Sequence, residues 1–165
     1  MNEMSKTADE PRFPDFPRTE FEERYSRARQ KMREGKLDAL FITDPTNYTY
    51  FSGHRSDQLG TQKIRPFVFL LPLEGEPVCF VMGFENKAIS STTFVRSVRN
   101  YDLFKHNPVF VEIIKERGLE GASIGFELGR EQYLSLSYND FNELKGLLPK
   151  ARFSDASRLI LDMRA

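Results

Sequence analysis

The chain has 165 residues and a formal net charge of zero, from 24 Lys plus Arg against 24 Asp plus Glu, and its length suits a single domain. The balanced charge argues against a general nucleic-acid binder, because such binding depends mainly on clustered positive charge. The N-terminus lacks the apolar core of a secretory signal, and no apolar run approaches the ~20 residues of a membrane span. The composition therefore predicts a cytoplasmic protein that binds neither nucleic acid nor a membrane.

The first 18 residues differ from the rest of the chain. They contain three prolines among charged side chains, which predicts a flexible N-terminal arm over residues 1–18 unless Phe13 and Phe16 dock on the domain. We expect residues 19–165 to form that domain.

The first helix of the domain is predicted from its ends and its period. Thr19 and Glu22 form a capping-box pattern, and Gly35 suits the residue that follows a helix. Four apolar residues recur at helical spacing on one face: Phe21, Tyr25, Ala28 and Met32. The opposite face is rich in arginine, which we interpret as a solvated surface rather than a binding site.

Strands and helices alternate along the rest of the chain. The expected strands are 38–43, 65–73, 76–83, 95–101, 122–127 and 151–153, and the expected helices are 84–91, 108–117, 132–147 and a last one from 155. The helix over 132–147 is expected to turn Tyr133, Leu136, Phe141 and Leu144 inward. Glu74-Gly75 between two apolar runs predicts a hairpin. This order predicts an α/β fold, a three-layer sandwich with a mixed, mostly parallel sheet of about five or six strands and helices on both faces.

Few residues are candidates for a self-contained catalytic site. Cys79 lies in an apolar run and is interpreted as an inert core thiol, because a reactive cysteine needs a partly exposed, electropositive setting. His106, between a lysine and an asparagine, is interpreted as a surface residue. The sequence contains no H-E-x-x-H, G-x-S-x-G, P-loop or G-x-G-x-x-G motif. We therefore expect no catalytic residue and no metal-binding residue in this chain.

The segment DPTNYTYFSGHRSDQ, residues 44–58, is the richest in polar and aromatic side chains. Gly53 can adopt a positive φ and turn the chain sharply, which exposes the residues after it. His54 titrates near neutral pH, and Arg55 can bind a carboxylate through two hydrogen bonds. A salt bridge between Asp57 and Arg55 that merely closes the loop is the alternative to a binding role.

The earlier part of the same segment is interpreted as structural. Asn47 is expected to hydrogen-bond its own turn, as asparagine does after Pro-Thr. Three aromatic residues are expected to pack in the core rather than to stack on a ligand: Tyr48, Tyr50 and Phe51.

Several segments carry a family resemblance. FEERYSRARQKMREGKLDALFITDPTNYTYFSG contains a helix, then LDAL, then PTNYTYFSG, and IRPFVFLLPLEGEP, ASIGFE and ARFSDASRLILDMR follow it in order. This set resembles the N-terminal domain of the creatinase/prolidase/aminopeptidase P family, over residues 17–164. In that family the domain precedes a "pita-bread" catalytic domain, in which Xaa-Pro peptidases hold two metal ions on two Asp, one His and two Glu.

The resemblance implies a function for the chain. It implies the non-catalytic N-terminal domain of an Xaa-Pro peptidase-like, prolidase-like or creatinase-like hydrolase, with Mn, Co or Zn held in the absent catalytic domain. The implied partners are that C-terminal domain, a second copy in a homodimer, and a small peptide or small-molecule substrate. By their position near the entrance of the active site in such enzymes, four residues are candidate substrate contacts: His54, Arg55, Asp57 and Arg65.

Two other functions remain open from the sequence. The chain is alternatively a protein- or peptide-binding module from a catalytically inactive relative of these enzymes, or a regulatory domain that acts alone. The presence or absence of the five metal ligands in a following domain distinguishes the hydrolase from the binding module.

Overall fold

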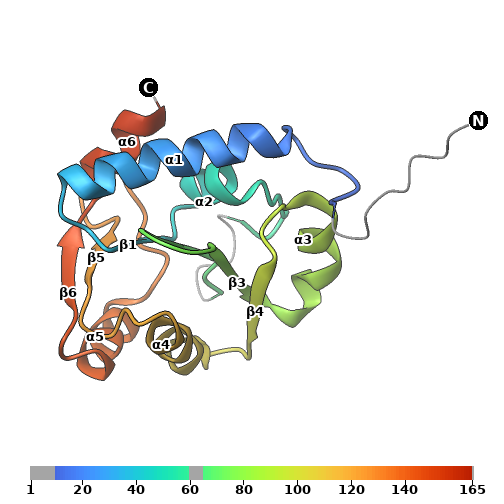
Figure 1. Ribbon diagram of the computed structural model, residues 1–165. Coiled ribbons are helices and arrows are strands. Elements are labelled where there is room, and N and C mark those ends of the chain that lie inside the picture. The colour runs from blue at the N-terminus through green and yellow to red at the C-terminus, as the bar shows by residue number, and fades with distance from the viewer. Residues whose placement is uncertain (1–9, 60–64, 165) are drawn as a thin grey trace, which may run out of the picture.

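A computed structural model describes residues 10–59 and 65–164, and one six-stranded sheet forms its centre (Figure 1). The strands are β1 (Ala39–Ile42), β2 (Val68–Pro72), β3 (Val78–Met82), β4 (Ser97–Tyr101), β5 (Ser123–Phe126) and β6 (Arg152–Asp155). They lie in the order β4-β3-β2-β1-β5-β6. Each expected strand is therefore present, with its ends shifted by a few residues.

The sheet is mixed and mostly parallel, as predicted. Strand β2 is antiparallel to both neighbours, β1 and β3, whereas β1 with β5, β5 with β6, and β3 with β4 are parallel. The predicted hairpin is confirmed, because β2 and β3 pair with Phe69 opposite Cys79, and Gly75 in the turn has a φ of 95°.

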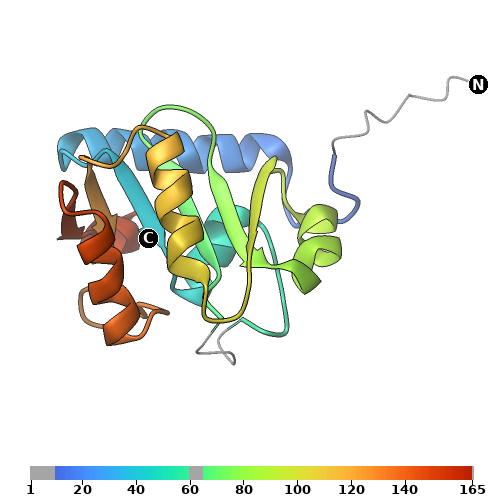
Figure 2. The same ribbon diagram turned by 90° about the horizontal axis from the view of Figure 1, so that it is seen from below.

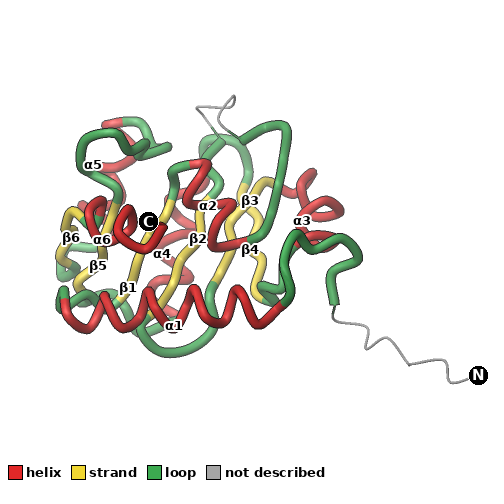
Figure 3. The backbone as a smooth tube through the Cα atoms, turned by 90° about the horizontal axis from the view of Figure 1, so that it is seen from above, coloured by secondary structure: helices red, strands yellow, loops and turns green. Residues whose placement is uncertain are grey.

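Helices cover both faces of the sheet, which confirms the three layers. On one face lie α1 (Arg18–Glu34), α2 (Pro45–Ser52) and α6 (Ser157–Arg164), which Figure 3 shows from above. On the other face lie α4 (His106–Glu116) and α5 (Tyr138–Leu147), visible in Figure 2. A short 3₁₀ turn, η1 (Gly83–Glu85), and α3 (Asn86–Thr92) follow β3 beside the edge strand β4.

Two apolar clusters hold these layers together, one on each face of the sheet. Strand β1 supplies both, because its alternate side chains point to opposite faces: Leu40 and Ile42 join the cluster under α1, and Ala39 and Phe41 join the cluster over α4. All four are fully buried, which explains why this strand reads as a continuous apolar run. Full burial of a large apolar side chain stabilises the fold by about 1.5–3 kcal/mol.

The start of α1 differs from the prediction. The helix begins at Arg18 with Pro17 as its N-cap, and no side chain caps it, so the expected capping box of Thr19 and Glu22 does not form. The reason is that Pro17 already has the extended backbone that an N-cap requires, which places Thr19 inside the first turn. The expected buried face is confirmed by Phe21, Ala28 and Met32, and by Tyr25, which is partly buried.

Helix α5 is shorter than predicted. It begins at Tyr138, because the Ser137 hydroxyl accepts a hydrogen bond from the Asp140 backbone N–H and caps the helix there. The residues before the cap form a loop, and Tyr133, expected to point inward, is 72% exposed. Leu136 and Leu144 are buried as expected.

The interpretation of His106 as a surface residue is wrong. Its exposed fraction is 3%, and its ring packs against Tyr101 and Phe110 at centroid distances of 5.7 and 5.5 Å. The error arose because the helix begins at His106 rather than at residue 108, which turns the ring towards the sheet. Neither ring nitrogen has a hydrogen-bond partner among the described residues, although Nε2 lies 3.6 Å from Oδ2 of Asp140.

The division into an arm over 1–18 and a domain over 19–165 stays a prediction. Residues 1–9 lie outside the described residues. Within the ranges 10–59 and 65–164, no helix is long and apolar enough to cross a membrane.

Candidate functional site

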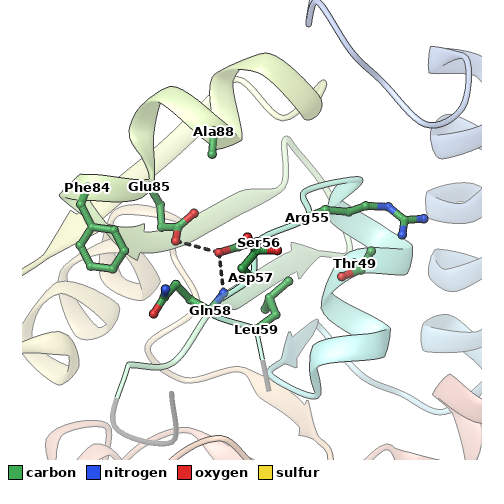
Figure 4. A pocket seen from close by; sticks show the side chains of 9 residues that line it. All are labelled: Thr49, Arg55, Ser56, Asp57, Gln58, Leu59, Phe84, Glu85 and Ala88. Carbon is green, nitrogen blue, oxygen red and sulfur yellow. Dashed lines mark hydrogen bonds between the residues drawn. The ribbon is translucent and has the colours of Figure 1, made fainter. Parts of the chain in front are cut away.

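An open cavity of about 630 Å³ lies between the segment that follows α2 and the turn η1 with the start of α3 (Figure 4). Its lining residues are Thr49, Arg55, Ser56, Asp57, Gln58, Leu59, Phe84, Glu85 and Ala88. Two of the four predicted contact residues, Arg55 and Asp57, therefore line one cavity, together with an acidic side chain, Glu85, that the sequence did not indicate.

Helix α2 and its two ends position the cavity loop. Asp44 caps the helix, because its side chain accepts hydrogen bonds from the backbone N–H groups of Thr46 and Asn47 at 2.9 and 3.2 Å. Gly53 ends it with a φ of 71°, as predicted. A Cβ at Gly53 would also lie 2.7 Å from the Phe21 ring, so both the backbone and the packing require glycine here.

His54 lies behind the cavity wall rather than in it, so the expectation that the turn at Gly53 exposes this residue is wrong. Its exposed fraction is 0%, and its ring nitrogens lie 3.2 Å from Thr92 Oγ1 and 3.2 Å from Glu85 Oε2. Burial lowers the pKa of His54, and the nearby Glu85 carboxylate opposes that shift. A hydrogen bond between the His54 ring and Glu85 Oε2 thus fixes the position of the Glu85 carboxylate.

Glu85 is one of the two acidic residues that line the cavity. It is 5% exposed, and its Oε1 accepts a 2.8 Å hydrogen bond from the Ser56 hydroxyl (Figure 4). Ser56 Oγ in turn accepts a hydrogen bond from the backbone N–H of Gln58 at 3.1 Å. The carboxylate thus connects η1, which leads into α3, to the loop after Gly53. No local pattern in the sequence marks it, because its partners come from residues about 30 positions away.

Arg55 lies at the rim of the cavity and its side chain is 69% exposed. It forms an ion pair with Asp15, a residue of the N-terminal segment. Asp57 is also exposed and lines the same cavity. An exposed cation and two carboxylates around one hollow suit a small ligand that carries both charges.

Arg65, the fourth predicted residue, lies next to the cavity rather than on its lining. Its guanidinium carbon is 5.8 Å from the centroid of the Phe84 ring, and Phe84 itself lines the cavity. The Nε atom of Arg65 is buried and has no hydrogen-bond partner among the described residues. The structure therefore brings all four predicted residues to one region and places two of them on its surface.

A second polar cluster is buried where β1 and β5 end. Glu127 Oε2 accepts hydrogen bonds from the backbone N–H groups of Thr43 and Asp44 at 2.6 and 2.7 Å, and its Oε1 accepts one from Asn47 Nδ2 at 2.6 Å. Asn47 Oδ1 accepts a further hydrogen bond from Arg164 at 2.8 Å. The side chain of Asn47 thus bonds distant residues rather than its own turn, which corrects the prediction for it.

Other reactive side chains are buried in the core. Burial raises the pKa of the Cys79 thiol well above its usual range, which agrees with an inert core thiol. Tyr48 and Phe51 are fully buried and pack in the cluster under α1, as predicted. In the part of the chain that the structure describes, no group of three or more His, Cys, Asp or Glu side chains is placed to hold a metal ion.

Comparison with known proteins identifies the fold. The model of the family described as "Creatinase/Prolidase N-terminal domain" matches residues 24–165. Among curated proteins, the ectoine hydrolase of Halomonas elongata is 26% identical over 160 residues, covering 91% of this chain and 38% of the relative. An uncharacterized hydrolase/peptidase of Sinorhizobium fredii is 22% identical over 154 residues, covering 88% of this chain and 38% of the relative. The chain thus spans little more than a third of these relatives.

Solved structures share the architecture. A proline dipeptidase of Streptococcus pneumoniae superposes with a TM-score of 0.68 at 22% identity, covering 85% of this chain and 96% of that one. The prolidase of Thermococcus sibiricus gives a TM-score of 0.70 at 19% identity, covering 87% of this chain and 36% of that one. The N-terminal domain of the cytoplasmic peptidase PepQ of Mycobacterium tuberculosis gives a TM-score of 0.66 at 18% identity, covering 86% of this chain and 98% of that one.

Proposed function

Because the chain belongs to the creatinase/prolidase N-terminal domain family, we propose that it is the non-catalytic N-terminal domain of an Xaa-Pro peptidase-like hydrolase. In this role the domain narrows access to an active site and contributes a charged contact to the terminal group of a small substrate. Binding energy gained at such a remote group assists the orientation of the substrate at the reacting bond.

One observation carries the proposal. Arg55, Asp57 and Glu85 line one open cavity of about 630 Å³, so a cation at its rim and two carboxylates lie around the same space. A dipeptide has a free carboxylate and a free amine, and these groups complement the guanidinium and the carboxylates respectively. In this proposal Arg55 and Asp57 touch the ligand, His54 positions Glu85, and Arg65 supports the apolar wall at Phe84.

The proposal includes partners outside this chain. The chain covers 38% of each curated relative, which supports a following C-terminal pita-bread domain as its partner. Such a domain would hold the divalent metal, Mn, Co or Zn, that activates water for peptide hydrolysis. We also propose a homodimer and a cytoplasmic location, the latter supported by the likeness to a peptidase that is described as cytoplasmic.

A second substrate class has a specific observation in its favour. The ectoine hydrolase is 26% identical over 160 residues, 91% of this chain, so ectoine or a similar small molecule, rather than an Xaa-Pro peptide, is the alternative substrate. A binding module without hydrolysis is the third candidate. The sequence of the gene beyond Ala165 separates them, because five metal ligands there favour a metal-dependent hydrolase and their loss favours a binding module.

The isolated 165-residue chain is expected to lack peptidase activity. Purified chain mixed with Xaa-Pro dipeptides should release no proline above the blank, with or without added Mn, Co or Zn, because cleavage requires the catalytic domain. The measurement is a colorimetric assay of free proline, with a prolidase as positive control. Proline release that a chelator abolishes would contradict the proposal.

Replacing Arg55 is expected to weaken substrate binding in a protein that carries both domains. Arg55→Ala should raise KM for Xaa-Pro dipeptides about tenfold and change kcat much less, because a charge-assisted hydrogen bond to the substrate contributes about 1.5–3 kcal/mol. Arg33→Ala is the matched control, since Arg33 is 57% exposed, forms an ion pair with Glu74 and does not line the cavity. An unchanged KM in Arg55→Ala would leave the loop without a role in binding.

A further inference from the structure

An N-terminal strap, defined as residues 10–17, lies beside the start of α1 and reaches α3 (Figure 1). The backbone N–H of Phe13 donates a 2.8 Å hydrogen bond to the carbonyl oxygen of Ser91. The guanidinium carbon of Arg24 lies 4.7 Å from the centroid of the Phe16 ring. These contacts anchor the strap to the domain at two points, one on each side of Asp15.

Between the two anchors, the strap supplies the partner of Arg55. The Nε–H of Arg55 donates a hydrogen bond to Oδ2 of Asp15, and the two side chains form an ion pair at the surface. In Figure 4 the Arg55 guanidinium extends away from Ser56 and Glu85, two other residues that line the cavity. Among the nine lining residues drawn in Figure 4, Arg55 is the one with a positive charge. Its guanidinium is thus turned out of the cavity while Asp15 binds it.

The Asp15–Arg55 contact has the same chemistry as the ligand contact proposed above. A guanidinium presents its N–H groups to a carboxylate in a fixed fork, so two carboxylates compete for the same donors. Asp15 is tethered to the domain on both sides, and a tethered group has a high effective concentration near its partner. A free ligand therefore has to displace Asp15 before it binds Arg55.

We propose that Asp15 is a built-in competitor for the carboxylate of the ligand, and that the strap withholds Arg55 until a carboxylate displaces it. This inference rests on the proposed function, because it takes Arg55 as the ligand-contacting cation. It narrows the ligands of the cavity to small molecules with a free carboxylate, such as a peptide C-terminus. A ligand without that group leaves the strap bound to Arg55.

The test compares the wild-type 165-residue chain with Asp15→Asn, which keeps the shape of the side chain and removes its charge. Both are titrated with Ala-Pro and with Ala-Pro amide, which lacks the carboxylate, while NMR follows the backbone N–H signals of Ser56 and Asp57, which line the cavity and are present in every variant. We expect Asp15→Asn to bind Ala-Pro about two- to fivefold more tightly, because an exposed ion pair changes an equilibrium by about that factor. The amide is expected to bind both proteins equally.

Two further variants make the result decisive. Glu74→Gln is the matched control, because Glu74 forms an exposed ion pair with Arg33 and does not line the cavity, so its affinity for Ala-Pro should equal that of wild type. Arg55→Ala tests the proposed function itself. Unchanged Ala-Pro binding in Arg55→Ala, or no binding by any variant, would overturn the proposed function and this inference together.

Other outcomes overturn the inference alone. If Arg55→Ala weakens Ala-Pro binding but Asp15→Asn binds like wild type, Asp15 does not compete with the ligand. If Asp15→Asn binds more weakly, Asp15 instead orients Arg55 for the ligand. Equal tightening towards Ala-Pro amide would also overturn it, since the carboxylate would then not be the group that competes.

Discussion

Replacing Glu127 by Ala is expected to lower the free energy of unfolding by about 3–5 kcal/mol, the largest effect of any single substitution considered for this chain. Removal of the carboxylate leaves two buried backbone donors, the N–H groups of Thr43 and Asp44, without an acceptor. Asn47 Nδ2 loses one of its two acceptors and keeps only the Gln132 side-chain oxygen. An unsatisfied buried donor costs about 1–3 kcal/mol. Urea denaturation followed by circular dichroism measures the change.

The position of Glu127 explains the size of the effect. Its exposed fraction is 1%, and the donors that it accepts from lie at the point where β1 leads into α2. Burial raises the pKa of Glu127, and the hydrogen bonds from Asp44, Thr43 and Asn47 oppose that shift. These donors therefore stabilise the Glu127 carboxylate. The carboxylate in turn holds the chain where β1 leads into α2.

Two variants test whether the hydrogen bonds, rather than the volume of the side chain, are responsible. Glu127→Gln keeps the shape of the side chain and one acceptor oxygen, but its amide N–H groups face a donor. It should therefore lower the free energy of unfolding by about half as much as Glu127→Ala. Glu120→Ala is the control, because Glu120 is exposed and a surface substitution changes stability by about 0.5 kcal/mol or less. A Glu127→Ala protein as stable as the Glu120→Ala protein would contradict the argument.

The domain is expected to lose stability steeply as the pH falls below about 6.5, the ordinary pKa of histidine. Burial lowers the pKa of both histidines, His54 and His106, and nearby carboxylates oppose that shift only in part. Between the lowered pKa and 6.5 the unfolded chain binds more protons than the folded one, so the folded state is disfavoured. Each histidine contributes a slope of at most about 1.4 kcal/mol per pH unit.

The environment of His106 makes its contribution separable. The charged groups that face it are Asp140 and Glu143 of α5, and the strand and helix beside it present the rings of Tyr101 and Phe110. Since neither ring nitrogen has a hydrogen-bond partner among the described residues, a nonpolar ring loses no hydrogen bond in this position. His106→Phe should therefore fold and retain the packing of the ring.

The measurement is the free energy of unfolding of wild type and His106→Phe at pH 7.5 and pH 5.5. We expect the decrease between these two values to be smaller by about 1 kcal/mol in His106→Phe, because one of the two titrating groups is absent. His106→Asn, which is polar but does not titrate, should show the same reduced decrease. Identical pH profiles for all three proteins would show that His106 has the same pKa in the folded and the unfolded chain and contributes nothing to the pH dependence.

Much of the fold could be predicted from the sequence, because it depends on local patterns. Each signal involves only a few neighbouring residues: the apolar runs, the Glu74-Gly75 turn and the helical period of α1. The strands and the hairpin lie where these signals predicted them. The ends of the helices were less predictable. The N-caps are Pro17 for α1 and Ser137 for α5. An N-cap depends on the backbone conformation of a single residue, and several residues close together in the sequence could each take that position.

The sequence by itself determined the layers of the fold and the glycine pivot at Gly53, because each follows from the type and spacing of adjacent residues. The region of the candidate site came from the family resemblance and stays a prediction. Only the tertiary structure decided which polar groups meet. Glu85 and His54 are 31 positions apart, and Asn47 and Glu127 are 80 apart. Such pairs form because strands and helices from distant segments pack together, and a buried polar group must find its partner wherever that packing brings one within about 3 Å.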